Sequence, residues 1–359
     1  MGRLPELQIG DIKAKLPIIQ GGMGVRISLA NLASAVANEG GVGTIACALI
    51  GGAMSHNSMD EHETADVHEL TQQIRKAKSL TTGVLAVNVM VALTNYQSLV
   101  KTSAREGIDL VVCGAGLPLG LPKLVEGTKA KIAPVVSSGR AADIICRSWT
   151  RKYKRPPDLI IVEGSLAGGH LGFGFDEVED KGKAPKLEDI VLDVIKVVKQ
   201  YETRCNCRIP VVAAGGVYYG KDIAKYLKLG CSGAQLATRF ACTHECDADD
   251  RFKQEYIRAK KEDIAIIKSP VGMPGRAIKN DFLIRAEKGE IEFDCDYQCL
   301  RPCVPSESIY CIADALTNAA KGELDKGFVF VGANAYRVDK MLHVKDLMKE
   351  LVEDAEANL

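Results

Sequence analysis

A histidine directly follows two glycines in the stretch EGSLAGGHLG, which covers residues 163 to 172. Glycine lets the backbone approach a ligand closely, and histidine is the side chain that most easily exchanges protons near neutral pH. Gly168, Gly169 and His170 therefore predict the floor of a site for a flat or phosphorylated ligand, with a proton-handling group at its rim. The competing interpretation is an ordinary core histidine.

Two other segments, VVAAGGVYYG and GAQLATRF, carry small residues that favour phosphate binding. Gly215 and Gly216 follow one apolar run, and Ala237 and Thr238 follow the next. Backbone amides and a helix N-terminus at such positions bind phosphate in many strand–helix barrels. Each glycine could instead only form a tight turn, but their occurrence after consecutive runs favours the ligand.

A single amide, that of Asn88, interrupts the apolar run GVLAVNVMV. A buried amide without a hydrogen-bond partner is costly, so we expect its side chain to bond a planar heterocycle with ring donors and acceptors. A backbone-capping role is the alternative. The glycines of GAGLPLG, residues 114 to 120, have the wrong spacing for a dinucleotide-binding loop.

Eight short apolar runs, separated by stretches with helical spacing, must position these residues. Apolar strands that alternate with amphipathic helices indicate a parallel sheet covered by helices. Eight units favour an α/β fold of the (β/α)8 TIM-barrel type over an open sheet, which more often has roughly five to seven strands. The barrel's site would lie where the strands end. The runs are LPIIQGGM, GVGTIAC, GVLAVNVMV, IDLVVCGAG, KIAPVVSSG, DLIIVEGS, IPVVAAGGV and GAQLATRF.

The alternation of strands and helices stops after residue 240. We predict that residues 241–326, with their charge-rich helix, Pro/Gly loop and cysteines, form an inserted lid or substrate domain. Residues 1–240 and 327–359 then form the barrel, whose last helix is predicted in VDKMLHVKDLMKELVEDA. A second extension, after the second run, carries three histidines that we expect to be solvated: His56, His62 and His68.

Charge and composition exclude several classes of protein. The 46 basic side chains equal the 46 acidic ones, so neither nucleic acid nor an anionic membrane is expected as a partner. The first residues lack the apolar run of a signal peptide, and no later segment has the length of a membrane span. We expect a cytoplasmic protein with twelve reduced cysteines. A homodimer is one oligomeric state that the sequence allows.

Four of the cysteines, Cys295, Cys299, Cys303 and Cys311, lie within seventeen residues. Core cysteines rarely reach this local density, and clustered thiolates bind iron–sulfur clusters or zinc. The spacing matches neither the CxxC pairs of zinc sites nor the common ferredoxin runs. An iron–sulfur cluster, zinc and unliganded thiols are therefore all open.

The motifs jointly resemble those of the FMN-dependent nitronate monooxygenases, formerly called 2-nitropropane dioxygenases, and of the related flavin-dependent enoyl-acyl carrier protein reductases. The matching stretches are PIIQGGMG, GVLAVNVM, VEGSLAGGHLG, IPVVAAGGV, GAQLATRF and GRAIKN. Ala237 stands where the family usually has glycine. Glu163, and QGGMG in place of an alanine–proline before Met23, are closer to the reductases.

The resemblance implies a flavin mononucleotide, FMN, across the barrel mouth, with His170 as the catalytic acid or base. An ordinary pKa of about 6.5 would suit His170 for this role near working pH. The implied cofactor-binding residues are Gly22 and Met23 along the isoalloxazine, Asn88 on its polar edge, Gly168 and Gly169 near the ribityl chain and phosphate, Gly215, Gly216, Ala237 and Thr238 around the phosphate, and Glu163.

The implied reaction is oxidation of a nitronate or nitroalkane, completed by oxygen. One alternative is reduction of an enoyl thioester, with NADH or NADPH as the electron donor. A non-catalytic flavin-binding protein is another. The substrate would be a small molecule or an acyl thioester.

Overall fold

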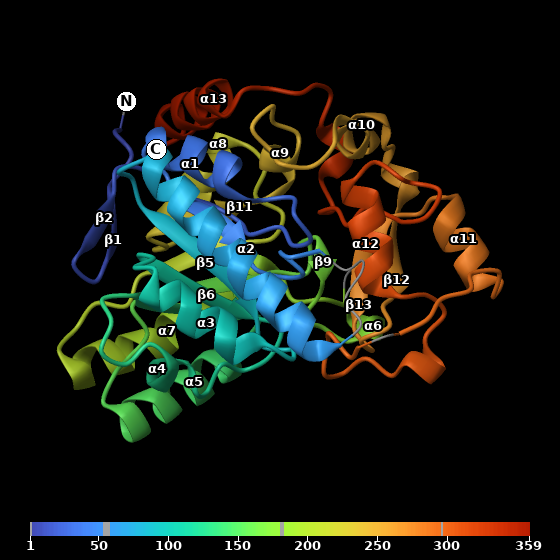
Figure 1. Cartoon of the computed structure of the whole chain (residues 1–359). Helices are drawn as coiled ribbons and strands as arrows, with labels where there is room; N and C mark the ends of the chain where they lie inside the picture. The colour runs from blue at the N-terminus through green and yellow to red at the C-terminus, as the bar shows by residue number, and fades with distance from the viewer. Residues whose placement is uncertain (1, 53–57, 180–182, 296) are drawn as a thin grey trace.

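The computed structural model describes residues 2–52, 58–179, 183–295 and 297–359. Its central strands are β3 (Ile18–Gln20), β4 (Gly43–Ala46), β5 (Leu85–Met90), β6 (Leu110–Gly114), β7 (Lys131–Val136), β8 (Ile160–Glu163), β10 (Val211–Ala214) and β11 (Gly233–Leu236). They pair in parallel in the order β3-β11-β10-β8-β7-β6-β5-β4. A parallel bridge from Ile19 to Val42 joins β3 to β4 and closes the sheet. Figure 1 shows strands of this sheet, among them β5, β6 and β11, with helices around them. Each predicted run contains one strand, which confirms the (β/α)8 barrel.

Amphipathic helices cover the outside of the barrel. In α7 (Leu187–Cys205), the buried residues Ile190, Val191, Val194 and Val198 lie one to four positions apart and so share one face of the helix. The last helix, α13 (Val344–Ala357), lies where it is predicted. It packs mainly against α8 (Gly220–Lys228) and α1 (Ala30–Asn38). The helices are α1 (Ala30–Asn38), α2 (Met59–Leu80), α3 (Tyr96–Arg105), α4 (Leu121–Leu124), α5 (Gly139–Tyr153), α7 (Leu187–Cys205), α8 (Gly220–Lys228), α9 (Thr238–Ala241) and α13 (Val344–Ala357).

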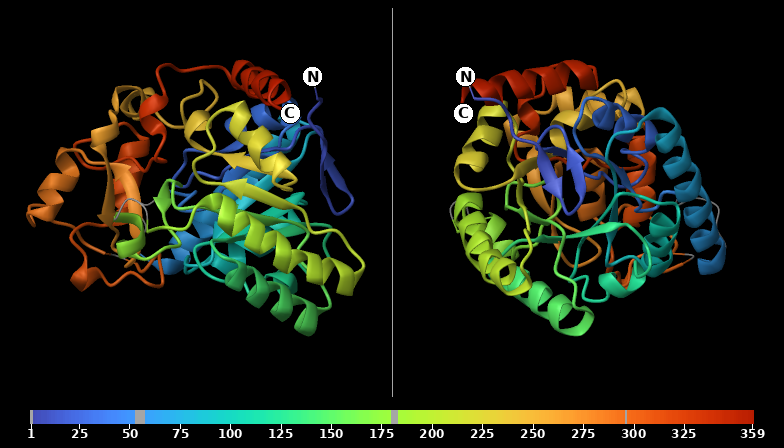
Figure 2. Two further views of the ribbon diagram at one scale, coloured as in Figure 1. Left: turned by 180° about the vertical axis from the view of Figure 1, so that it is seen from behind. Right: turned by 90° about the vertical axis from the view of Figure 1, so that its left-hand side faces the viewer.

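A short hairpin that the sequence did not predict, β1 (Leu7–Ile9) with β2 (Ile12–Ala14), closes one end of the barrel. Leu7 and Ile9 are fully buried in one core cluster with Ile19, Val112 and other strand residues that fill the barrel interior. Figure 2 shows the hairpin at the end opposite to the inserted residues. The carboxyl ends of the strands therefore form the open mouth.

The inserted residues lie over that mouth. They contain α10 (Asp250–Arg258), β12 (Ile264–Lys268), β13 (Pro274–Ile278), α11 (Asp281–Glu287), α12 (Ile312–Ala320) and the 3-10 turns η1 (Lys261–Asp263) and η2 (Pro305–Glu307); α6 (Phe175–Glu179) and η3 (Ala335–Arg337) flank them. Unexpectedly, β12 and β13 form an antiparallel hairpin, which pairs with β9 (Gly169–His170). This small sheet connects the glycine–histidine loop of the barrel to the insertion.

The histidines of the second extension have different environments. The prediction that His62 is solvated is wrong: it is 1% exposed, because α2 turns it inward, and its ring stacks on Tyr297 with centroids 4.3 Å apart. His68 is exposed as expected. His56 lies outside the described residues. Among the described helices, none combines the length and the apolar character needed to cross a membrane.

Candidate active site

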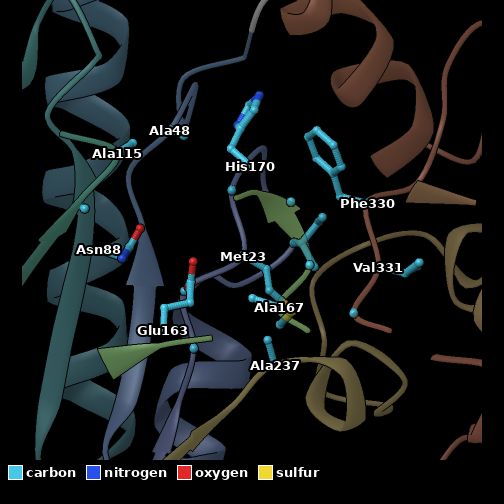
Figure 3. A pocket seen from close by; sticks show the side chains of 18 of the residues that line it. Met23, Ala48, Asn88, Ala115, Glu163, Ala167, His170, Ala237, Phe330 and Val331 are labelled. Carbon is cyan, nitrogen blue, oxygen red and sulfur yellow. The ribbon is translucent and has the colours of Figure 1, made fainter. Parts of the chain in front are cut away.

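A cavity of about 300 Å³ lies at the carboxyl ends of the barrel strands, beneath the inserted residues. Its wall combines strand ends with residues from α10, α12 and the segment after α12 (Figure 3). The structure brings together here every residue that the sequence analysis assigned to catalysis or to the cofactor. These are Gly22, Met23, Asn88, Glu163, Gly168, Gly169, His170, Gly215, Gly216, Ala237 and Thr238.

His170 is held in place by residues of the insertion and of the segment that follows it. Its Nε2 atom and the Oγ atom of Ser269 are 2.7 Å apart in a hydrogen bond. Its ring meets the ring of Phe330 edge-on, with centroids 5.1 Å apart. Backbone pairing of β9 with β13 places His170 opposite Gly275. Three contacts from distant parts of the chain therefore orient one imidazole at the cavity.

The electrostatic state of His170 differs from the expectation of an ordinary pKa. Burial lowers the pKa of His170 to about 4, because the imidazolium loses hydration. The sequence-based assumption of a pKa near 6.5 is therefore wrong for the ligand-free site. At neutral pH the ring is uncharged, with one nitrogen as donor and the other as acceptor.

Two polar side chains enter the cavity from strand ends. Asn88 comes from β5 and Glu163 from the end of β8, and Glu163 points toward the side on which His170 lies (Figure 3). Burial raises the pKa of Glu163 to about 7, so its carboxyl group is partly protonated near neutral pH. Neither side chain makes a hydrogen bond with another described residue, and both are therefore available to a ligand.

The glycines of the site allow chain segments to pack closely. A Cβ atom on Gly168 would lie 2.6 Å from the backbone nitrogen of Gly332, and one on Gly215 would lie 2.7 Å from the carbonyl oxygen of Gly164. Gly215 also has a φ of 87°, which favours glycine. Close packing of the cavity wall thus accounts for these two glycines, independently of any ligand.

A buried arginine holds the loop that precedes His170. Arg276, on β13, is 7% exposed, and its Nη1 atom donates to the carbonyl oxygens of Ser165 at 2.7 Å and Ala167 at 2.5 Å. Burial lowers the pKa of Arg276 to about 10, still far above neutrality. No described carboxylate forms an ion pair with it, so its positive charge is uncompensated beside the site.

Backbone strain gathers around the same cavity. Val25, Leu49 and Ala115 all line it, and all have positive φ angles, of 57°, 51° and 52°. Residues other than glycine rarely adopt this left-handed backbone conformation, and such strain is concentrated at functional sites in proteins. The strained loops independently mark this cavity as the functional site.

Sequence reasoning missed several residues of the cavity wall. Gln235 interrupts an apolar run as Asn88 does, and the same signal could have identified it. Tyr256 and Phe330 carry no recognisable motif, although the Tyr256 hydroxyl donates to the Phe330 carbonyl oxygen at 2.8 Å. Only the fold shows that these two residues cover the mouth.

The four clustered cysteines lie apart from this cavity. They line a second, narrower one, and Ile312 belongs to the walls of both. All twelve cysteines of the chain are described, and all are free thiols.

Comparison with known proteins identifies the family. Residues 6–108 and 93–354 match the family model described as nitronate monooxygenase. A probable nitronate monooxygenase of Staphylococcus saprophyticus is 27% identical over 338 residues, which cover 88% of this chain and 86% of that protein. A (3aS,4S,5R,7aS)-5-hydroxy-7a-methyl-1-oxo-octahydro-1H-indene-4-carboxyl-CoA dehydrogenase of Mycobacterium tuberculosis is 26% identical over 273 residues. That match covers 76% of this chain and 66% of the dehydrogenase, slightly less than two thirds of its length.

A solved structure agrees with these matches. The structure of FabK from Thermotoga maritima superposes with a TM-score of 0.74 at 25% identity, covering 96% of this chain and 94% of FabK. The family model spans most of the chain, and the matched residues include the whole cavity. The chain therefore belongs to the nitronate monooxygenase family, a family of flavin-dependent oxidoreductases, as its motifs predicted.

Proposed function

We propose that this protein is an FMN-dependent oxidoreductase that oxidises nitronates and nitroalkanes, with His170 handling the substrate's proton. Family membership supports the flavin, and the staphylococcal relative supports the substrate class. The observation that carries the proposal is the uncharged imidazole of His170. A hydrogen bond to Ser269 orients this ring at the cavity, which the side chains of Asn88 and Glu163 also enter.

The cavity residues fit FMN by their chemistry. Asn88 and Glu163 enter the cavity without partners among the described residues, and they match the donors and acceptors of a flavin ring. The backbone amides of Gly215 and Gly216 and the hydroxyl of Thr238 suit a phosphate. Arg276 donates to the loop that precedes His170 and has no ion-pair partner among the described residues. Its positive charge therefore favours an anionic group in the cavity.

Bound FMN supplies the capacity to accept a hydride or single electrons. The chain binds and orients the substrate and moves its proton. In the tautomer whose Nε2–H donates to the Oγ atom of Ser269, the Nδ1 atom of His170 is unprotonated and can accept the α-proton of a nitroalkane. Once protonated, Nδ1–H can donate a hydrogen bond to the nitronate oxygen. The negative charge that develops on the nitronate raises the pKa of the imidazole beside it, and this favours the transfer.

A second candidate is reduction of an enoyl thioester with NADH or NADPH as the donor. It is supported by the likeness to FabK and by the CoA thioester in the name of the mycobacterial relative. The residues at Glu163 and before Met23 also resemble those of the enoyl reductases. In this reaction His170 would orient or protonate the thioester product.

The test begins with purification under anaerobic conditions and chromatographic identification of any released flavin. An alkyl nitronate is then added to one sample, and NADH or NADPH to another, followed by a short enoyl-CoA. We expect the flavin absorbance to bleach with the nitronate alone. Bleaching only by the nicotinamide nucleotide, with reoxidation by enoyl-CoA, would establish the second candidate, and absence of flavin would refute both.

The role of His170 is tested by His170→Ala, with His68→Ala on the exposed face of α2 as the matched control. Loss of a positioned acid or base reduces turnover by about 10²- to 10⁴-fold. We expect this loss in His170→Ala with flavin still bound, and full activity in His68→Ala. Unchanged turnover in His170→Ala would remove His170 from the mechanism.

A further inference from the structure

A polar pair lies on the buried face of α2. His62 is 1% exposed and Asp66 is 0% exposed, and their Nε2 and Oδ2 atoms are 3.3 Å apart. Because they are four positions apart on one helix, the two side chains point to the same side. Burial of a carboxyl group is costly unless hydrogen bonds replace its lost hydration. Packing alone would favour apolar residues at these positions, so the contacts of the pair must account for it.

Asp66 holds the loop that follows β4. Its Oδ1 atom accepts a hydrogen bond from the backbone nitrogen of Gly51 at 2.7 Å. The loop lies so close to α2 that a Cβ atom on Gly51 would be 2.7 Å from the carbonyl carbon of Ala65. Two residues before Gly51, Leu49 has a φ of 51° and lines the main cavity. A positive φ outside glycine persists only where surrounding contacts fix it, and the carboxyl group of Asp66 supplies one of them.

The same carboxyl group holds the loop that follows β5. The Oδ2 atom of Asp66 accepts a hydrogen bond from the Nδ2 atom of Asn95 at 2.8 Å, and Asn95 is buried. Two residues before Asn95, Leu93 lines the main cavity. Asp66 therefore bridges two neighbouring loops of the barrel mouth, each of which contributes a leucine to the cavity.

His62 extends these contacts to the insertion. Its ring stacks on Tyr297, at the start of a segment whose Leu300 forms a backbone bridge with Leu93. Leu300 lines the main cavity as well. Leu49, Leu93 and Leu300 thus come from three separate segments, and each lies two or three residues from a group that contacts the pair.

Leu49, Leu93 and Leu300 together form one apolar wall of the main cavity, the leucine wall. Leu49 packs in a buried cluster with Val25 and Ala313, which also line the cavity. The residues that suit a phosphate follow β10 and β11, whereas the leucine wall follows β4 and β5 and is completed by the insertion. In the closed sheet, β3 separates these two strand pairs on one side, and β6, β7 and β8 separate them on the other. This part of the cavity therefore suits an apolar group.

We propose that Asp66, together with His62, positions the leucine wall, and that this wall binds the alkyl chain of the nitronate. The inference rests on the proposed function, because it assigns a subsite to that substrate. The reacting nitro group lies at His170, and the chain extends from it to the leucine wall. Asp66 does not line the cavity, so its loss should weaken the binding of long-chain substrates and leave the chemical step unchanged.

The test compares long and short ligands in the flavin-loaded protein. Hexanoate and acetate imitate nitronates, since a carboxylate has a similar planar pair of oxygen atoms, and titration calorimetry measures their dissociation constants. Steady-state kinetics give KM and kcat for the nitronates of 1-nitrohexane and nitroethane. Asp66→Ala is compared with the wild type and with Asp60→Ala, whose side chain is exposed in the first turn of α2. Bound flavin and far-UV circular dichroism report whether each variant is folded.

We expect the wild type to bind hexanoate at least about tenfold more tightly than acetate, because each buried methylene group contributes about fourfold. In folded Asp66→Ala this preference should fall by about fourfold or more, and KM for the long nitronate should rise with kcat unchanged. Asp60→Ala should behave as the wild type. If Asp66→Ala does not fold, Asp66→Asn, which keeps one acceptor oxygen, serves for the same comparison.

Absence of a hexanoate preference in the wild type, or an unchanged preference in the folded Asp66 variant, would overturn the proposal. A lower Tm alone would reveal a merely structural role for the carboxyl group. Because calorimetry does not depend on turnover, the two possible failures can be told apart. Oxidation of short nitronates without a hexanoate preference refutes only this inference. A hexanoate preference that depends on Asp66, without oxidation of any nitronate, refutes only the proposed function.

Discussion

The Nε2 atom of His170 lies 2.7 Å from the Oγ atom of Ser269, although the two residues are 99 positions apart in the chain. One residue belongs to a barrel loop, and the other follows β12 of the insertion. The hydrogen bond therefore couples the barrel to the layer that covers its mouth, and it leaves only one nitrogen of the imidazole for a ligand.

Ser269→Ala is predicted to weaken catalysis without abolishing it. The hydroxyl orients the imidazole but does not touch substrate, and one neutral hydrogen bond contributes about 1 kcal/mol, or roughly a fivefold effect. We expect kcat/KM to fall about fivefold, with flavin content unchanged. Steady-state kinetics measure this, and Ser79→Ala, at an exposed position on α2, is the control. Equal kinetics for the two variants would show that Ser269 has no orienting role.

The pH dependence near neutrality is predicted to come from Glu163 rather than His170. Burial raises the pKa of Glu163 to about 7, whereas it lowers that of His170 to about 4, so only the carboxyl group changes charge between pH 6 and 8. An anionic nitronate is repelled by the carboxylate that forms above pH 7. We expect KM to rise with pH through 7 in the wild type and to stay constant in Glu163→Gln. A step that persists in Glu163→Gln would assign it to another group.

The same carboxyl group is predicted to affect stability. Glu163 keeps its proton to about pH 7 when folded but loses it near 4.5 when unfolded. The unfolded state then binds fewer protons between these values, so the free energy of unfolding falls as pH rises from about 4.5 to 7. Chemical denaturation of the flavin-free protein across this range measures the decline. Glu163→Gln should reduce it, and identical slopes in both proteins would contradict the assignment.

Arg276→Met is predicted to destabilise the loop that carries His170. The change leaves the carbonyl oxygens of Ser165 and Ala167 without their donor, at a cost of about 1–3 kcal/mol in the free energy of unfolding. Flavin affinity should fall as well, because a positive charge beside the site is lost. Urea denaturation and flavin titration measure the two effects. Arg75→Met, which removes an exposed ion pair with Glu106, should cost less than about 1 kcal/mol.

Gly168→Ala is predicted to disrupt the cavity wall. The added Cβ atom would lie 2.6 Å from the backbone nitrogen of Gly332, and backbone cannot move aside as a flexible side chain can. Overpacking of this kind costs about 1–3 kcal/mol. Thermal unfolding should show a lower Tm, together with weaker flavin binding. Gly120→Ala, where nothing lies within 4 Å of the added atom, should behave as the wild type.

Most of the barrel and the location of its site could be predicted from local patterns. The barrel strands of three to six apolar residues and the amphipathic helices can be recognised from neighbouring residues alone, because the local pattern indicates which face is buried. The site residues follow because parallel strands bring their carboxyl ends to one mouth. The small hairpin β12–β13 escaped prediction for two reasons. Strand β12 is only partly buried, and β13, although buried throughout, contains Pro274, Gly275 and Arg276 and so does not form an apolar run.

The family, the eight-stranded barrel and many of the residues around its mouth follow from local composition and motif order. The low pKa of His170, the hydrogen bonds from Arg276 to its loop, the close packing at Gly168 and the cavity shared by four cysteines depend on tertiary contacts. The physical reason is that desolvation, steric contact and convergence are set by segments far apart in the chain. No local sequence pattern indicates which of these distant segments come into contact.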